Sequence, residues 1–208
     1  MDEKYVVNIG RQFGSGGYTI ARHLADRLGI RFFDKELLAL AAKESGFQES
    51  LFEKKDEKKS LFDFICSVHT VFDGGHAVYG NCLSDESLFK IQSDVIAEQA
   101  SKQSCLFVGR CADYILRNNP RCVNIFISAD PDDRLKRICQ RLNVDEATAR
   151  KAIEKADEQR SAYYNYYSCK TWGAAATYHL CINSSKMGFE KTEDMIIDFI
   201  RATLHLNK

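Results

Sequence analysis

Glycines near the start of the chain give the strongest chemical signal in the sequence. Four of them lie within eight residues: Gly10, Gly14, Gly16 and Gly17. The nearly continuous apolar run over residues 5–9 is typical of a strand buried in a parallel sheet, and apolar residues recur at helical spacing over 20–28. Strand, glycine loop and helix in this order gather backbone N–H groups and the positive end of a helix dipole around one point. The pattern predicts an anion site, and the anion that we expect is phosphate.

Neither common phosphate-binding motif fits the loop in full. The Walker loop reads G-x-x-x-x-G-K-[ST], and aligning its second glycine with Gly16 puts Arg11 at its first glycine and Gly17 at its lysine. The dinucleotide motif G-x-G-x-x-G fits Gly14 and Gly16 but puts Thr19 at its third glycine. A plain turn that uses glycine for left-handed backbone is the alternative, although turns rarely need four glycines. Phosphate binding is the favoured interpretation.

Charged side chains are expected at the edge of the sheet that carries the loop. Asp34 follows a short predicted strand over 30–33, and Arg110 follows the apolar strand predicted over 105–109. Ligands of doubly wound sheets bind in the crevice at the carboxyl ends of the strands. An arginine there presents donors suited to phosphate. Asp34 either faces this crevice or caps the helix that follows it.

Arginines also gather on two predicted helices in the second half of the chain. Spacings of three and four place three of them on one face of the first helix: Arg134, Arg137 and Arg141. The second helix, with Asn143 as a candidate cap, carries Asp157 and Arg160 three residues apart and then four tyrosines within 163–167. For each arginine taken alone, a solvated surface charge is a more common role than a functional one. The tyrosines either stack on a base or pack the helix against the body, and we favour packing.

Composition narrows the classes of function. The 208 residues contain 29 basic and 29 acidic side chains, so no broad basic surface for nucleic acid is expected. No apolar stretch approaches the roughly 20 residues that span a bilayer, and we expect a soluble cytoplasmic protein without a membrane partner. The eight cysteines are scattered and form no C-x-x-C pair, which indicates reduced thiols rather than disulfides or a zinc site.

Predicted strands alternate with helices five times along the chain. This order predicts an α/β fold, a parallel sheet of about five strands flanked by helices. The length suits a single domain over residues 1–208. Residues 45–83 contain the charged run EKKDEKK and the turn glycines Gly74, Gly75 and Gly80, and we interpret them as an insertion that folds over a substrate.

In this order the stretches resemble the nucleoside monophosphate kinases, and among them the cytidylate kinase-like family. The resemblance rests on RQFGSGGYTIARHLADRLGI, FFDKELL, VGRCADYIL, FISADPDDRLKRI, DEQRSAYYNYYSCKTWG and YHLCINSS. It implies a P-loop kinase core, a helical monophosphate-binding insertion over about 45–83 and an arginine-bearing lid over about 142–170. It also implies ATP and Mg²⁺, with γ-phosphoryl transfer to a nucleoside monophosphate or a similar small acceptor.

The resemblance further assigns roles to individual residues. The phosphate loop would comprise Gly14, Ser15, Gly16, Gly17, Tyr18 and Thr19, and the Thr19 hydroxyl would be the protein ligand of Mg²⁺. The acceptor would be bound by Asp34, Arg110, Arg134 and Arg137. The catalytic charges would be Arg11, Arg110, Asp157 and Arg160.

Two positions depart from the family pattern. Gly17 stands where cytidylate kinases carry the loop lysine, and Cys111 stands where they carry an acid after the Gly-Arg pair. Loss of one charge-assisted contact to phosphate costs about 1.5 to 3 kcal/mol, and Arg11 is close enough to the loop to replace part of the charge. We expect Gly17→Lys to weaken ATP binding, because a loop with glycine here is rebuilt around it, for example through a positive φ at Gly17.

Two other classes of function stay open. A nucleotide-binding regulatory module without turnover would keep the loop and the sheet, and the missing lysine is what such a module would show, whereas Arg110 and Arg160 argue for catalysis. A dinucleotide-binding oxidoreductase is less expected, because the third small residue of its motif is absent. No motif specifies the acceptor or the oligomeric state.

Overall fold

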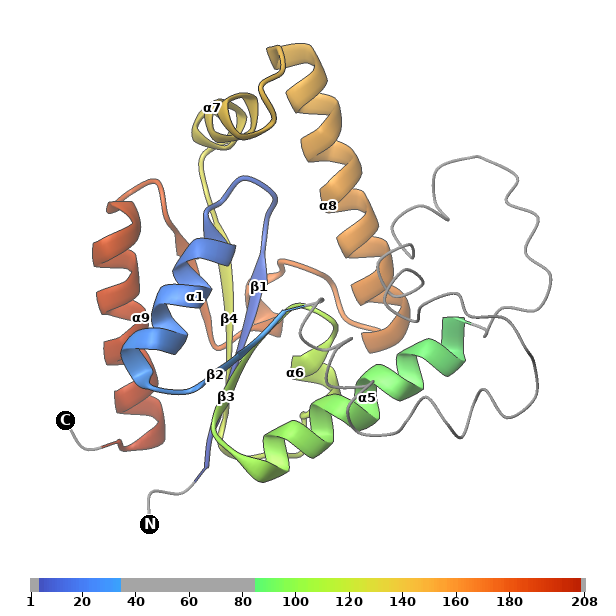
Figure 1. Cartoon of the computed structure of the whole chain (residues 1–208), viewed down its shortest axis with the longest axis vertical. Helices are drawn as coiled ribbons and strands as arrows, with labels where there is room; N and C mark the ends of the chain where they lie inside the picture. Colours follow the sequence, from blue (N-terminus) through green and yellow to red (C-terminus); the bar gives the residue numbers. More distant parts are fainter. Residues whose placement is uncertain (1–3, 35–84, 207–208) are drawn as a thin grey trace.

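A sheet of five parallel strands lies at the centre of the protein (Figure 1). The structure is a computed structural model that describes residues 4–34 and 85–206. The strands lie in the order β2-β3-β1-β4-β5. Their bounds are β1 (Val6–Arg11), β2 (Arg31–Phe33), β3 (Cys105–Val108), β4 (Cys122–Ser128) and β5 (Leu180–Asn183). The prediction of a parallel sheet of about five strands is confirmed.

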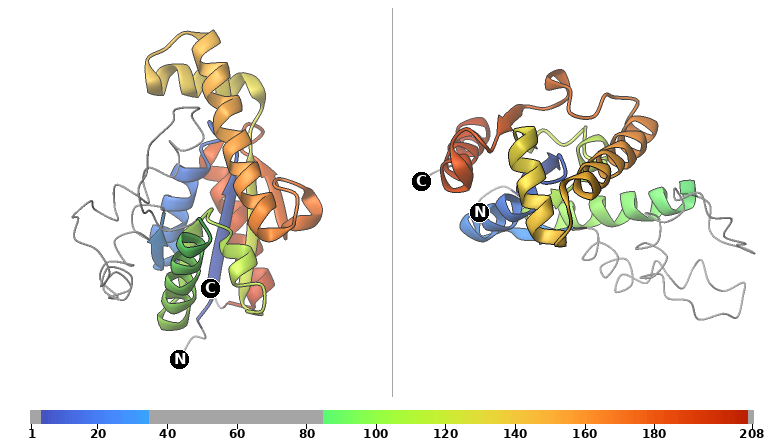
Figure 2. Two further views of the ribbon diagram at one scale, coloured as in Figure 1. Left: turned by 90° about the vertical axis from the view of Figure 1, so that its right-hand side faces the viewer. Right: turned by 90° about the horizontal axis from the view of Figure 1, so that it is seen from above.

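Helices cover both faces of this sheet (Figures 1 and 2). Their bounds are α1 (Gly17–Leu28), α5 (Asp85–Lys102), α6 (Ala112–Ile115), α7 (Pro131–Leu142), α8 (Glu146–Ser168) and α9 (Gly188–Leu204), with a 3₁₀ turn, η1, over Ala175–Thr177. One apolar core lies between the sheet and the helix pair α1 and α9, and the other lies between the sheet and the pair α5 and α6.

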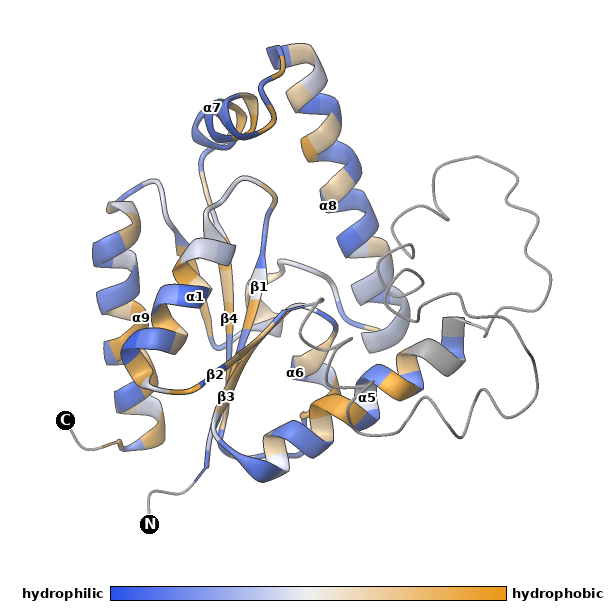
Figure 3. Ribbon diagram, in the orientation of Figure 1, coloured by the Kyte–Doolittle hydropathy of each residue, from blue (hydrophilic) through white to orange (hydrophobic). Residues whose placement is uncertain are grey.

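The central strand β1 explains why the chain folds in three layers. Val7 and Ile9 belong to the core with α1 and α9, whereas Val6 belongs to the core with α5. Successive side chains of a strand point to opposite faces, so an apolar run can fill both cores at once. Figure 3 accordingly shows largely apolar strands, and the helices that cover them are hydrophilic on their outer sides.

Helix α7 and the first half of α8 lie beyond the carboxyl ends of the strands, and α8 then runs down beside the sheet towards α6 (Figure 1). Pro131 begins α7, the position at which proline suits a helix. The prediction that Asn143 caps the second helix is wrong, because Asn143 has left-handed backbone and ends α7. Asp145 caps α8 instead, accepting a hydrogen bond of 2.8 Å from the N–H of Thr148.

Several other predictions can be compared with the described residues. The six cysteines within residues 4–34 and 85–206 are free thiols, as expected. In the same ranges no helix is long and apolar enough to cross a membrane, and no three histidine, cysteine or acidic side chains gather as metal ligands. The predicted insertion over 45–83, and the helix that Asp34 would cap, lie outside the described residues.

Candidate active site

The glycine loop joins β1 to α1 and carries glycine where backbone or space requires it. Gly14 and Gly16 have φ of 80° and 77°, which side chains disfavour. A Cβ on Gly14 would lie 2.9 Å from the carbonyl oxygen of Arg134, and a Cβ on Gly16 would overlap the ring of Phe189. Gly17 begins α1 without left-handed backbone, so the expectation of a positive φ there is wrong.

Ser15 lies inside the loop and holds its shape. Its side chain is buried, and its hydroxyl donates a hydrogen bond of 2.8 Å to the carbonyl of Gln12. The same hydroxyl accepts from the N–H of Gly17 at 3.2 Å. The hydroxyl of Ser184 donates to the carbonyl of Ser15 at 2.7 Å, which fastens the loop to the segment after β5. We therefore assign Ser15 to positioning of the loop.

A cavity of about 510 Å³, here named the loop cavity, opens over this loop. Its volume falls within the range of small-molecule sites. It is lined by loop residues, including Gly14, Gly16, Gly17, Tyr18 and Thr19, and by four arginines, Arg11, Arg137, Arg141 and Arg160. No carboxylate among the described residues lines it. A helix N-terminus faced by arginines suits a polyanion such as the phosphate chain of a nucleotide.

Two arginines of α7 hold the glycine loop through its carbonyl groups, and a third packs on a loop ring. Arg134 donates to the carbonyl of Phe13 at 2.8 Å, and Arg137 donates to the carbonyl of Gly14 at 3.1 Å. The guanidinium of Arg141 lies 4.5 Å from the ring centroid of Phe13. The prediction that these three arginines share a helix face is confirmed. Arg134, which the resemblance places at the acceptor, lines neither cavity.

Asp157 and Arg160 connect α8 to the same loop. One carboxylate oxygen of Asp157 accepts from the N–H of Phe13 at 2.8 Å, and the other pairs with Arg134. The Nη1 atom of Arg160 lies 3.7 Å from the Oδ1 atom of Asp157, as the three-residue spacing predicted. The same guanidinium donates a hydrogen bond of 3.4 Å to the carbonyl oxygen of Arg11. Asp157 therefore clamps the loop, whereas the guanidinium of Arg160 faces the cavities.

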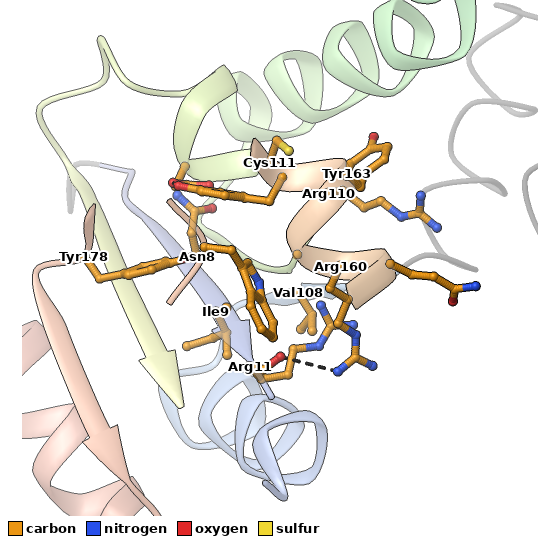
Figure 4. A pocket seen from close by; sticks show the side chains of 15 residues that line it. Asn8, Ile9, Arg11, Val108, Arg110, Cys111, Arg160, Tyr163 and Tyr178 are labelled. Carbon is orange, nitrogen blue, oxygen red and sulfur yellow. Dashed lines mark hydrogen bonds between the residues drawn. The ribbon is translucent and has the colours of Figure 1, made fainter. Parts of the chain in front are cut away.

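A second cavity, here named the aromatic cavity, adjoins the first at the carboxyl ends of β1 and β3 (Figure 4). Its aromatic walls are Tyr163, Tyr164, Trp172 and Tyr178, and its polar lining includes Asn8, Arg110, Asp113 and Gln159. The guanidinium of Arg110 lies 5.6 Å from the ring centroid of Tyr163. Aromatic walls and an arginine suit a small planar or cyclic molecule that bears an anionic group.

The floor of the aromatic cavity contains buried polar groups. The hydroxyl of Tyr164 donates to Asp113 at 2.6 Å, and burial raises the pKa of that carboxyl above its ordinary value. The side-chain amide of Asn8 donates to Asn124 at 2.8 Å. The carbonyl oxygen of the Asn8 side chain is buried and accepts no hydrogen bond from any described residue.

Arg11 and Arg160 line both cavities and mark their junction (Figure 4). Burial, followed by the charges of Arg160 and Arg110, lowers the pKa of Arg11 to about 9. Burial also lowers the pKa of Arg160. Repulsion among three guanidinium groups is relieved when an anion lies between them, so the junction is the strongest candidate anion site in the described part of the chain.

The remaining predicted residues lie beside the loop cavity. Tyr18 and Thr19 are exposed and line it, and the hydroxyl of Tyr18 donates to Asp34 at 2.9 Å. Asp34 is buried and lines neither cavity. Magnesium takes few protein oxygens and completes its shell with phosphate and water, so the exposed hydroxyl of Thr19 beside the phosphate site fits such an ion.

Some residues of the site carried no recognised signal in the sequence. Phe13 and Phe189 lie against arginines of the loop cavity, and Asp113 and Trp172 line the aromatic cavity. Asn8 could have been found, because a polar residue that interrupts a buried strand needs a reason. Phe189 could not, because only the tertiary fold brings it against Gly16.

Several solved structures are similar to this chain over nearly its whole length. The structure of an uncharacterized protein from Eubacterium ventriosum ATCC 27560 has a TM-score of 0.73 and 31% identity, with 96% of this chain and 99% of that chain covered. Shikimate kinase from Acinetobacter baumannii in complex with shikimate has a TM-score of 0.52 and 14% identity, covering 97% of this chain and 95% of that chain. Shikimate kinase from Bacteroides thetaiotaomicron has a TM-score of 0.51 and 14% identity, covering 97% and 99%.

These two kinases show a shared fold, that of the P-loop kinases. No curated protein sequence matches the chain. The model of the cytidylate kinase-like family matches residues 6–186, which include the glycine loop, all five strands and every lining residue of the two cavities except Phe189. The chain therefore belongs to the cytidylate kinase-like family.

Proposed function

We propose that the protein is an ATP-dependent phosphotransferase that moves the γ-phosphoryl group to a nucleoside monophosphate or a similar small phosphorylated acceptor. One observation carries the proposal: two cavities of different chemistry meet at Arg11 and Arg160. The loop cavity suits the phosphates of a donor, and the aromatic cavity suits an acceptor with a ring and an anionic group. Two anionic substrates in these cavities would meet where positive charge is concentrated.

The donor phosphates would be bound by the loop itself. The first residues of α1, Gly17, Tyr18 and Thr19, line the loop cavity, and so do Arg137 and Arg141 of α7. Thr19 would hold Mg²⁺, which when bound neutralises charge on the donor phosphates. Asp157 and Arg134 would act indirectly by fixing the carbonyl and N–H of Phe13.

The transfer step needs little covalent participation by the protein. Phosphoryl transfer between in-line oxygens depends mainly on positioning and on stabilisation of charge. Arg11 and Arg160 at the junction would neutralise the transferring group, and Arg110 would hold the acceptor phosphate. An acceptor phosphate is already an anion at neutral pH, so the proposal requires no general base.

We also propose that the chain is one domain and that its lid, which the resemblance places over about 142–170, comprises α7 and the first half of α8. The second half of α8 is fixed to the body, because Tyr164 bonds Asp113 and Tyr167 stacks on Phe89 with ring centroids 4.0 Å apart. The first half instead contacts the glycine loop through Asp157. Closure would then pivot about the tyrosine-rich end of α8.

The test is a phosphoryl-transfer screen with ATP and Mg²⁺. The acceptor panel contains nucleoside monophosphates, small phosphorylated metabolites and, because a structural neighbour binds shikimate, small hydroxylated metabolites. ADP release and the mass of the product are measured against a reaction without acceptor. We expect one class of acceptor to be phosphorylated much faster than ATP is hydrolysed. Tight ATP binding without transfer to any acceptor would contradict the proposal.

A regulatory nucleotide-binding module is the second candidate, and Gly17 in place of the loop lysine favours it. Thermal shift with ATP, CMP and NAD separates the classes. Stabilisation by ATP and CMP together supports the kinase. Stabilisation by ATP alone, with no turnover in the screen, supports the module, and stabilisation by NAD alone supports an oxidoreductase.

A further inference from the structure

Arg11 and Gly17 are neighbours in space at the two ends of the glycine loop. Arg11 is the last residue of β1, and Gly17 is the first residue of α1. A Cβ built on Gly17 would lie 2.6 Å from the Cβ of Arg11 and 3.2 Å from its Cγ. The stem of Arg11 therefore occupies the space in which a side chain at position 17 would begin.

The guanidinium of Arg11 is accommodated by a second glycine. A Cβ on Gly109, at the end of β3, would overlap the Nη1 atom of Arg11. Gly109 also has φ of 76°, so both its backbone and its missing side chain suit this position. One side chain thus accounts for the lack of a Cβ at two places, Gly17 beside its stem and Gly109 beside its charge.

This guanidinium has donors that the protein leaves unused. Among the described residues, no carboxylate or carbonyl accepts a hydrogen bond from it, and none forms an ion pair with it. The charges with the largest influence on its pKa are two cations, Arg160 and Arg110, which outweigh the opposite influence of Asp157 and Asp34, and it lines both cavities. A largely buried, unpaired cation is costly to keep, which points to a ligand anion as its partner.

We infer that Arg11 supplies to the donor phosphates the positive charge that a Walker loop takes from its lysine. The inference rests on the proposed function. Relative to the Walker pattern, the two ends of the loop are exchanged: the first glycine is Arg11, and the lysine is Gly17. The exchange works as a unit, because a lysine at position 17 and an arginine at position 11 require the same space at their stems.

The inference is tested by exchanging the two residues back. ATP affinity is measured by calorimetry, in the presence of Mg²⁺ and without acceptor, for Arg11→Gly, Gly17→Lys and the double variant. Arg150→Ala is the matched control, because Arg150 is an exposed arginine of α8 that lines neither cavity. Melting temperatures without ATP separate loss of binding from loss of folding.

We expect Arg11→Gly to fold and to bind ATP tenfold to hundredfold more weakly, the usual effect of removing one charge-assisted contact. Gly17→Lys should also bind more weakly or melt earlier, because its stem collides with that of Arg11. The double variant should bind ATP at least tenfold more tightly than Arg11→Gly. With Arg11 removed, the stem of the new lysine has space and its ammonium group can contact the donor phosphates.

Three results overturn the inference. They are ATP affinity of Arg11→Gly within twofold of the wild type, a double variant that binds no better than Arg11→Gly, and weakening by Arg150→Ala as large as by Arg11→Gly. The first two leave the proposed function intact, because the wild type still binds ATP. A wild type that binds no ATP overturns the proposed function together with the inference.

Discussion

The two cavities that meet at Arg11 and Arg160 are built in different ways. The loop cavity is formed largely by consecutive backbone, by the start of α1 and by arginines at helical spacing on α7. The aromatic cavity takes its walls from β1, β3, α6, α8 and the segment around Trp172 and Tyr178. A phosphate chain presents similar oxygens in every nucleotide, so a short segment can bind it. An acceptor is specific in shape, and the aromatic cavity, which we propose for it, is assembled from distant segments.

This difference assigns distinct effects to the shared and the separate residues. A residue at the junction should affect the transfer step, a residue of the loop should affect the fold and the donor, and a residue of the aromatic cavity should leave the donor unaffected. Substitutions of Arg160, Gly16, Arg110 and Asp113 examine these expectations in turn, from the largest effect to the smallest.

Arg160→Ala should have the largest effect. We expect kcat to fall on the order of 10³-fold, the range found for arginines that neutralise a transferring phosphoryl group, with smaller changes in either KM. Folding should change little, because Arg160 repels Arg11, and this repulsion offsets the loss of its contact with Asp157. Steady-state kinetics with both substrates varied measures this effect. An increase only in the KM for ATP would show that Arg160 belongs to the donor side and not to the junction.

Gly16→Ala should damage the loop. The new alanine would have to keep the left-handed φ of Gly16, and its Cβ would overlap the ring of Phe189. We therefore expect a loss of about 2 to 4 kcal/mol in the free energy of unfolding. Gly29→Ala is the matched control, since Gly29 also has positive φ but a Cβ there meets nothing within 4 Å. Chemical denaturation should show the larger loss at Gly16. Phe189→Ala in the Gly16→Ala background should recover part of the difference, and equal losses at the two glycines would contradict the packing argument.

The contrast between Gly16 and Phe189 also shows what the sequence could reveal. The sheet, the glycine loop between β1 and α1 and the shared face of Arg134, Arg137 and Arg141 followed from glycine clusters and from regular spacing, which are local. The positive φ expected at Gly17 was wrong, because the reason for glycine there is the stem of Arg11, a contact in space.

Capping was misassigned for a related reason. Asn143 and Asp145 are both residues that cap helices, and a shift of two residues decides which of them ends α7 and which begins α8. The aromatic cavity was not predicted as a unit, since Asn8 and Tyr178 lie far apart in sequence and no periodicity relates them.

Arg110→Ala should affect the acceptor and leave the donor unchanged. Arg110 lines only the aromatic cavity, so we expect the KM for the acceptor to rise about tenfold to hundredfold while the KM for ATP stays within twofold. Arg117→Ala is the matched control, because Arg117 is exposed and packs on Tyr114 outside both cavities. A parallel rise in the KM for ATP would mean that the two cavities are not separate binding sites.

Asp113→Asn should have the smallest effect, visible as a change in pH dependence. Burial raises the pKa of Asp113 above its ordinary value of 3.8, so between these two values the folded protein binds more protons than the unfolded chain. This group therefore makes the wild type less stable as pH rises through that window. Asparagine cannot ionise, yet its carbonyl can still accept the hydrogen bond from Tyr164.

The variant should consequently gain stability relative to the wild type as pH rises above 3.8, on the order of a few degrees in melting temperature. Asp130 and Asp145 have lowered pKa values, from hydrogen bonds with Lys186 and Thr148, and their contribution to stability has the opposite sign, being lost as pH falls. Both carboxylates are present in both proteins, so the difference between the two melting curves isolates Asp113. A difference that stays constant with pH would show that Asp113 is ionised without cost, and the aromatic cavity would then be more polar than its walls indicate.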